Sequence, residues 1–237
     1  MFAGLFLLCL SALNAEKSST SIDATENIQF DSEFQQSEPS NSDESGQCGE
    51  TVTYSFDSQT GTLTISGTGP MSKYDGPEKP PWDSYKDKIV TLVIEQGVTT
   101  IGDYAFLACS GIKSISIAEG VLSIGELTFH LCGNLTSIEL PNSVKGLGIY
   151  AFGQCTALKS VTLGTDLVTI DPGAFNKCTG VKEVVVKNNL QLSMLKRLFQ
   201  QRTIEKIQLQ GEVTKIESTA FKMFFGVSSI YIGDKVE

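Results

Sequence analysis

The sequence predicts a solenoid, in which the chain winds through a row of similar coils that share one core. Within residues 89–237, three kinds of apolar residue recur every 23 residues. A constant period of about 20 to 29 residues is typical of solenoids that place one short strand in each coil. The three series are Phe106, Phe129, Phe152 and Phe175; Cys109, Cys132, Cys155 and Cys178; and Ile94, Ile117, Leu140, Leu163, Val186, Leu209 and Ile232.

Each coil contains an alternating segment that predicts one short β-strand. The clearest example is residues 114–117, where Ile115 and Ile117 would point inward and Ser114 and Ser116 outward. Successive strands would form a parallel sheet with a spacing of about 4.8 Å, so that equivalent residues of neighbouring coils touch. We expect this sheet on the concave side, with irregular or short helical segments on the convex side.

Residues 48–88 predict a cap over the first coil. Two alternating runs, 51–57 and 62–66, flank a turn that contains Gly61, which is typical of a β-hairpin. The following connection, residues 71–88, contains Trp82, the only tryptophan. It would pack over the first coil, because the open end of a solenoid must be covered to stay soluble. A ligand-binding role for Trp82 is the alternative.

The coil after Val186 departs from the pattern. Ser193, Leu198 and Gln201 replace the expected Ile, Phe and Cys, and in the next coil Phe224 occupies the cysteine position. Apolar residues at Leu192, Leu195, Leu198 and Phe199 predict one or two amphipathic helical turns on the outer face.

The N-terminal region divides into two segments. Residues 1–15 are apolar and end in small residues, which predicts a secretory signal peptide; an uncleaved anchor or a mis-assigned start are the alternatives. Residues 16–47 predict an acidic, Ser-rich, disordered spacer. They carry −7 of the net charge of −9, so the remainder is nearly neutral and has no basic cluster of the kind that binds nucleic acid. No later segment is long and apolar enough to span a membrane.

The four repeat cysteines would stack with parallel Cα–Cβ vectors, which disfavours disulfide geometry. Packing as small apolar residues is the favoured role, with bridging as the alternative. No metal site or cofactor is predicted, because the only histidine, His130, has no compact ligand spacing around it. We expect His130 to be partly packed on the outer arc. The sequence contains no pattern that pairs a nucleophile with a base, which predicts that the chain is not an enzyme. Asn134–Thr136 forms a glycosylation sequon.

Outward-facing strand positions are the best candidates for ligand binding. The regular coils offer mostly small polar residues there, whereas the C-terminal coils offer larger ones, and interface hot spots favour large side chains such as tyrosine. A simply solvated sheet face is the alternative. The candidate ligand-binding residues are Glu139, Glu183, Val185, Lys206, Gln208 and Tyr231.

The repeat I-G-x-x-A-F-x-x-C-x-x-L-x-S-I-x-I resembles the leucine-rich repeats of the BspA-like family of bacterial and protist surface proteins. Residues 60–69, Pro80–Trp82 and Gly97–Val98 resemble its N-terminal module. The resemblance covers residues 48–237 and implies a curved leucine-rich-repeat solenoid at the cell surface that is used for protein binding or adhesion, with no catalytic residues. The sequence ends at Glu237 without a capping module, so either another molecule partners this end or the sequence is a short or truncated family member.

These observations predict a secreted or cell-surface protein that binds a protein or host-surface ligand through the concave sheet. A structural spacer without a ligand is the alternative, and an enzyme-associated domain is a weaker one. Ligand identity, mode of anchoring and oligomeric state stay open.

Overall fold

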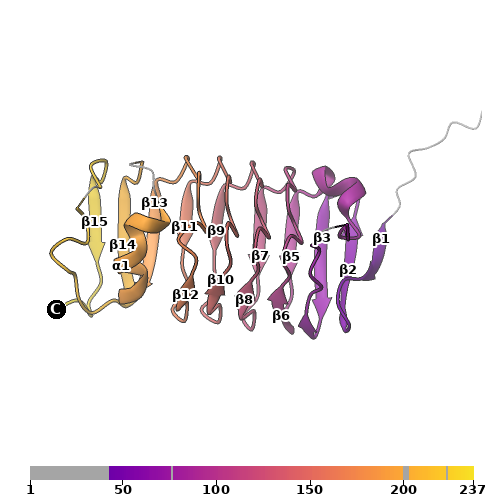
Figure 1. Cartoon of the computed structure of the whole chain (residues 1–237), viewed down its shortest axis with the longest axis horizontal. Helices are drawn as coiled ribbons and strands as arrows, with labels where there is room; N and C mark the ends of the chain where they lie inside the picture. Colours follow the sequence, from indigo (N-terminus) through magenta and orange to yellow (C-terminus); the bar gives the residue numbers. More distant parts are fainter. Residues whose placement is uncertain (1–42, 76, 200–202, 223) are drawn as a thin grey trace, which may run out of the picture. The chain divides into compact units, whose positions relative to one another are not determined.

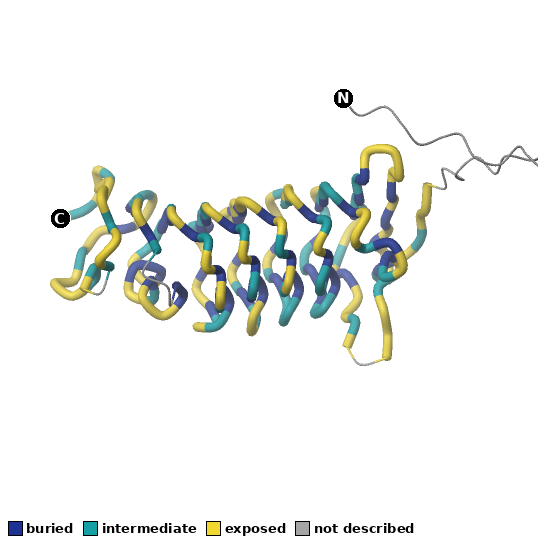
Figure 2. The backbone as a smooth tube through the Cα atoms, turned by 90° about the horizontal axis from the view of Figure 1, so that it is seen from above, coloured by how far each residue is buried: buried dark blue, intermediate teal, exposed yellow. Residues whose placement is uncertain are grey.

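The computed structural model describes residues 43–75, 77–199, 203–222 and 224–237. They fall within one compact unit that begins at Asn41. The predicted signal peptide, residues 1–15, and the predicted spacer up to residue 42 lie outside the described residues. Figure 1 shows the unit as a nearly straight row of coils, and Figure 2 shows the same row from above. We call the outward side of the main sheet the sheet face.

The main sheet runs along the row, receives one strand from each coil and consists of two five-stranded parts, with no strand pairing between β7 and β9 in the described residues. Its N-terminal part pairs β1–β2–β3 antiparallel and then continues in parallel through β5 and β7. Its C-terminal part is parallel throughout, in the order β9–β11–β13–β14–β15. The predicted β-hairpin and the predicted strand of each coil are confirmed. The strands are β1 (Glu44–Gln47), β2 (Val52–Asp57), β3 (Thr62–Gly67), β5 (Thr91–Ile94), β7 (Ser114–Ile117), β9 (Ser137–Glu139), β11 (Ser160–Thr162), β13 (Glu183–Asn188), β14 (Lys206–Glu212) and β15 (Ser229–Ile232).

A second parallel sheet lies across the core from the first, in the order β12–β10–β8–β6–β4. Sequence analysis predicted irregular or helical segments there. Most of these strands have only two residues, too few for alternation of apolar and polar residues to reveal them. The strands are β4 (Gly69–Pro70), β6 (Val98–Ile101), β8 (Ser123–Ile124), β10 (Gly146–Leu147) and β12 (Thr169–Ile170).

The phenylalanine series forms a continuous stack of rings. Neighbouring centroids lie 5.1 to 5.3 Å apart from Phe106 through Phe175. Trp82 extends the stack at one end, 5.1 Å from Phe106, and its Nε1 donates a hydrogen bond to the carbonyl of Ala105 at 2.8 Å. The predicted packing of Trp82 over the first coil is confirmed. Phe199 extends the other end, 5.1 Å from Phe175. The assignment of Leu198 to this series was wrong, although Leu198 is also buried.

The cysteine series is buried and unbridged. Three of the four thiols donate to the carbonyl of the phenylalanine 26 residues earlier: Cys132 to Phe106 at 3.4 Å, Cys155 to Phe129 at 3.2 Å and Cys178 to Phe152 at 2.9 Å. Burial raises the pKa of the Cys109 thiol to about 12. The residues therefore act as small apolar side chains with a weak donor, as the favoured interpretation of the sequence stated.

The repeated glycine after the isoleucine lets neighbouring coils approach. A Cβ atom at Gly102 would lie 1.8 Å from the carbonyl oxygen of Ser72, and one at Gly148 would lie 2.6 Å from the backbone nitrogen of Glu126. Both distances are far inside van der Waals contact. A side chain at Gly102 or Gly148 would therefore push the neighbouring segments apart, whereas the fold accommodates Asp171 at the equivalent position of a later coil.

The irregular coil contains helix α1 (Asn189–Leu198), which Figure 1 shows in front of β13 and β14. The helix begins three residues before the predicted segment, because the Asn188 side chain accepts a hydrogen bond from the backbone N–H of Gln191 at 2.9 Å and caps its first turn. The predicted apolar face of Leu192, Leu195 and Leu198 is buried, as expected.

Two boundary predictions differ from the structure. Glu44–Gln47, assigned to the spacer, forms β1, because its backbone pairs antiparallel with β2. The connection over residues 71–88, expected to be irregular, ends in the 3₁₀ helix η1 (Asp83–Lys88). The buried segments otherwise recur at equivalent places along the row of coils (Figure 2).

Candidate functional site

The six candidate residues lie on four strands of the main sheet. Strand pairing places the outward residues of successive coils side by side: Thr162 beside Glu139, Val185 beside Thr162, Gln208 beside Val185 and Tyr231 beside Gln208. Glu183 lies beside Lys206 in the adjacent column. The predicted 23-residue spacing of these columns is therefore present in the register of the sheet.

A polar hollow of about 340 Å³ opens on the sheet face above β9, β11, β13 and β14. Four candidates, Glu139, Glu183, Val185 and Gln208, line this hollow, which we call the polar hollow. Lys187 and Gln210 also line it and were missed by sequence analysis. Strands β13 and β14 have six and seven residues, compared with three in β9 and β11, so each adds one further residue to the sheet face. Continued alternation past Val185 and Gln208 is the signal that would have found them.

Val185 differs from its prediction. It was expected to be exposed, but only 8% of its surface is accessible, and it forms the floor of the polar hollow together with Val161. The larger side chains of the neighbouring positions, Glu183, Lys187 and Gln208, rise around it. Val185 therefore offers a small apolar contact at the bottom of a polar site.

A chain of polar contacts fixes the side chains of the hollow, and we call it the sheet-face network. Gln210 Nε2 donates to Gln208 Oε1 at 3.0 Å, and Gln208 Nε2 donates to Glu183 Oε1. Lys206 Nζ forms an ion pair with the same carboxylate oxygen at 2.9 Å. These hydrogen bonds from Lys206 and Gln208 lower the pKa of Glu183. Lys206, a predicted binding residue, thus acts on the site through Glu183 and does not line the hollow.

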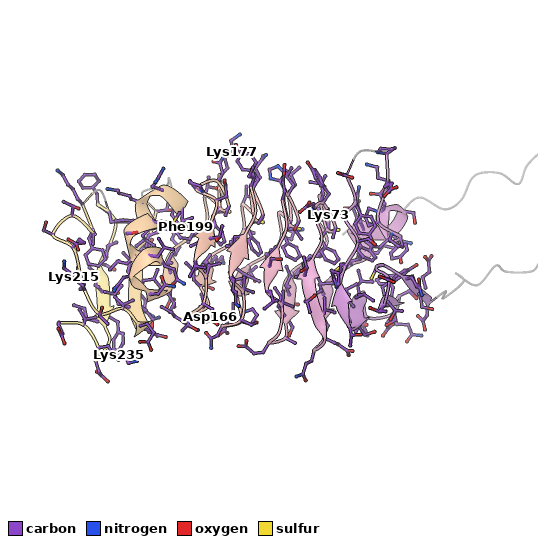
Figure 3. All side chains as sticks on the ribbon, turned by 60° about the horizontal axis from the view of Figure 1, so that its bottom comes forward. Lys73, Asp166, Lys177, Phe199, Lys215 and Lys235 are labelled. Atoms are coloured by element: carbon purple, nitrogen blue, oxygen red, sulfur yellow. The ribbon has the colours of Figure 1, made fainter. Side chains whose placement is uncertain are left out.

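A second hollow of about 460 Å³ adjoins the first and shares Gln208 and Gln210 with it. Tyr231 lines this hollow and is 55% exposed. Lys235, which Figure 3 labels at the C-terminal end of the row, also lines it. Together the two hollows form one continuous surface from Glu139 to Tyr231.

A third hollow, of about 260 Å³, lies between α1 and the last coil. Leu192 and Ala220 give it an apolar wall, and Lys196 and Lys215 stand at its rim. Lys215 is already paired with Glu217 at 3.0 Å. Asn189, which also lines it, donates to Thr214 Oγ1 at 2.9 Å and accepts from the backbone N–H of Thr214 at 3.0 Å.

His130 is packed as predicted. Its Nε2 lies 3.1 Å from Gln154 Nε2, and its ring lies 6.0 Å from that of Tyr150. Burial and then the charge of Lys177 lower its pKa. In the described part of the chain no three His, Cys, Asp or Glu side chains come close enough to hold a metal ion. Among the helices that the structure describes, none is sufficiently long and apolar to cross a membrane.

Comparison with known proteins identifies the repeats. Six copies of the BspA type leucine-rich repeat region match residues 84–194 and 192–237. The chain belongs to this family. A comparison with curated proteins found no match.

One solved structure shares the fold, and two others match more weakly. A leucine-rich repeat protein from Eubacterium ventriosum matches with a TM-score of 0.53 at 19% identity, over 82% of this chain and 61% of that one. This chain thus spans about three fifths of that protein. A leucine-rich repeat protein from T. pallidum matches with a TM-score of 0.44 at 20% identity, over 78% of this chain and 79% of its own. A leucine-rich cell surface protein from Faecalibacterium prausnitzii matches with a TM-score of 0.44 at 22% identity, over 84% and 56%.

Proposed function

We propose that this chain is an exported recognition protein that binds a protein or host-surface ligand through the sheet face of its C-terminal coils. The observation that carries the proposal is the sheet-face network of Glu183, Lys206, Gln208 and Gln210. Side chains already held in one arrangement lose less conformational freedom when a ligand binds, so more of the contact energy appears as affinity.

Two further observations support a secreted or surface location. Residues 1–15 have the pattern of a signal peptide. The similar protein from F. prausnitzii is described as a cell surface protein. A non-enzymatic role accords with the leucine-rich-repeat family of the chain.

A structural spacer is the second candidate. The regular coils support it, because their sheet face presents an almost uniform column of small hydroxyl residues, Ser114, Ser137 and Ser160. Such a face offers no large side chain to anchor a partner. In this alternative the repeats hold two other parts of an assembly at a distance.

Binding of the full chain to cells and to extracellular matrix proteins separates the two candidates. We expect saturable binding that the double variant Gln208→Ala, Tyr231→Ala weakens by at least tenfold. The matched control is Ser114→Ala, Ser116→Ala, which changes the same face in a regular coil and should bind like the wild type. Thermal unfolding of both variants checks that they fold. Equal binding by the wild type and both variants would favour the spacer.

A further inference from the structure

The site proposed above has features that select among ligand classes, and this inference rests on that proposed function. The first feature is its charge balance. Lys206 compensates Glu183 at 2.9 Å, and the two remaining charged groups of the polar hollow, Glu139 and Lys187, have opposite signs. A charged ligand would therefore gain little from the field of the site, since complementary potentials are what attract charged partners. The balance favours a neutral ligand.

The second feature is the kind of polar group present. Glu139, Glu183, Gln208 and Gln210 end in planar carboxylate or amide groups, and Thr162 adds a hydroxyl. Adjacent donors and acceptors on such groups match a ligand whose hydroxyls each donate and accept. The apolar residues at the bottom are the small Val161 and Val185, which are 0% and 8% exposed. The site therefore provides hydrogen bonds in number but no deep pocket for an apolar side chain.

The third feature is an exposed aromatic ring at the end of the same surface. Tyr231 is the next residue along the column after Gln208 and is 55% exposed. An aromatic ring offers a large, rigid contact area at small entropic cost. The C–H face of a sugar ring packs on such a surface while its hydroxyls remain free for the amides.

The fourth feature is spacing. Coils repeat about every 4.8 Å along the row, whereas side chains on one side of an extended peptide recur about every 6.6 to 6.8 Å. A peptide that ran along the row would lose register with the coils after one or two contacts. The length of one unit in a 1,4-linked chain of sugar rings is close to the strand spacing, so such a chain would stay in register. A peptide lying across the row over β11, β13 or β14 would find the backbone groups of these strands already paired on both sides.

We infer that the sheet face from Glu139 to Tyr231 binds a neutral, linear glycan that runs along the row of coils. One sugar unit lies over each strand, its hydroxyls bonded to the polar side chains of the hollow. The terminal unit packs on the ring of Tyr231.

The test uses the full chain and immobilised neutral 1,4-linked oligosaccharides of increasing length. Affinity should rise with each unit until the chain spans the strands from β9 to β15, and it should change little with salt. Gln210→Ala should weaken binding about tenfold, the effect of one lost hydrogen bond of good geometry. Tyr231→Ala should weaken it similarly, whereas Tyr231→Phe, which keeps the ring, and Ser116→Ala, in the same column of a regular coil, should not.

A parallel measurement on intact cells separates this inference from the proposed function. Loss of binding after enzymatic removal of surface glycans, with Gln210→Ala also weakened, supports both. Binding that survives glycan removal but is abolished by protease, and is still weakened by Gln210→Ala, overturns the glycan and leaves the recognition function intact. Binding by Gln210→Ala and Tyr231→Ala at wild-type strength, or no binding of the wild type to cells or oligosaccharides, overturns both.

Discussion

The regular coils from β5 to β12 and the C-terminal coils from β13 to β15 share one 23-residue period but expose different chemistry. On the sheet face the regular coils present serines, such as Ser114 and Ser116 of β7. The C-terminal coils present Glu183, Gln208 and Tyr231, and Glu183 and Gln208 belong to the sheet-face network. Core positions follow the 23-residue period strictly. The candidate recognition residues lie at outward positions, where the period does not fix the residue type.

The cores of the regular coils and of the C-terminal coils also differ. Rings stack without a gap from Trp82 to Phe199, and every ring from Phe106 to Phe175 is fully or almost fully buried. Phe221 returns to the phenylalanine column but is only partly buried. In β15, the last of the described strands, Ile232 is 52% exposed, because the strand has a neighbour on one side only. The C-terminal coils are therefore expected to be less stable locally than the regular ones.

The largest predicted difference concerns the ring stack. Phe129→Ala removes a buried ring that lies 5.3 Å from Phe106 and 5.1 Å from Phe152, and should lower the free energy of unfolding by about 3 to 5 kcal/mol. The matched change Phe221→Ala, in the same column of the last coil, should have a clearly smaller effect because that ring is partly exposed. Urea denaturation followed by circular dichroism measures both. Equal losses would show that the two regions are packed alike.

The next effect concerns the boundary between the regions. Asn188 caps α1, and its Nδ2 donates to the carbonyls of Thr165 at 2.9 Å and Leu167 at 3.1 Å in the preceding coil. Asn188→Ala should lower the stability by about 1 to 2 kcal/mol, at the upper end for a helix cap. Ser193→Ala, an exposed position of the same helix, serves as the control and should change stability by less than about 0.5 kcal/mol. A cap variant that unfolds like the control would contradict this role for Asn188.

The pH dependence of stability between pH 7 and 5.5 should arise in the regular coils, because they contain His130, the only histidine. Its folded-state pKa is lowered by burial, so below about pH 6.5 the unfolded chain binds a proton more readily than the folded chain does. Stability should therefore fall as the pH drops from 7 to 5.5. The loss should stay below about 1 kcal/mol because much of the ring is exposed to screening solvent.

Thermal unfolding of the wild type and of His130→Gln at both pH values checks this prediction. The variant should lose the pH dependence within this range. The lowered pKa of Glu119 acts only at more acidic pH, where carboxylates titrate. A variant that retained the wild-type pH dependence would assign the effect to other groups.

The smallest effect should come from the ion pair of the C-terminal sheet face. Lys206→Gln removes an exposed pair with Glu183 and should change the stability by about 0 to 1 kcal/mol. Any loss should shrink at high salt, because ions screen exposed charges. Denaturation at low and high salt tests this. A loss of several kcal/mol would mean that the sheet-face network stabilises the fold.

The fold was largely predictable, because its core residues repeat. The columns of Phe, Cys and Ile, the hairpin and the packing of Trp82 all follow from spacing and alternation. The second sheet was missed because its two-residue strands carry no pattern. The phenylalanine position of the irregular coil was assigned to Leu198, one residue before Phe199, which occupies it. The reason is that α1 changes the path of the chain between Val186 and Leu209, although these two residues keep the 23-residue spacing.

The candidate site was predictable only in outline. Register placed Glu139, Gln208 and Tyr231 in one column, and the structure has them there. The burial of Val185 depends on the size of the side chains around it. The contact of Gln210 with Gln208 depends on the extra length of β14. A repeat pattern encodes neither feature. Side-chain contacts between coils are properties of the folded surface, so they became visible only in the structure.

A single alanine series along the sheet face tests the central claim that the first regular coils are scaffold, whereas the sheet face from Glu139 to Tyr231 recognises the ligand, most strongly at its C-terminal end. The series replaces Ser116, Glu139, Thr162, Gln208 and Tyr231 one at a time, and the dissociation constant of each full-length variant is measured on the same cell surface. We predict no change at Ser116, a small loss at Glu139 and Thr162, and losses of about tenfold at Gln208 and Tyr231. A flat profile, or one with its largest loss at Ser116, would contradict the account.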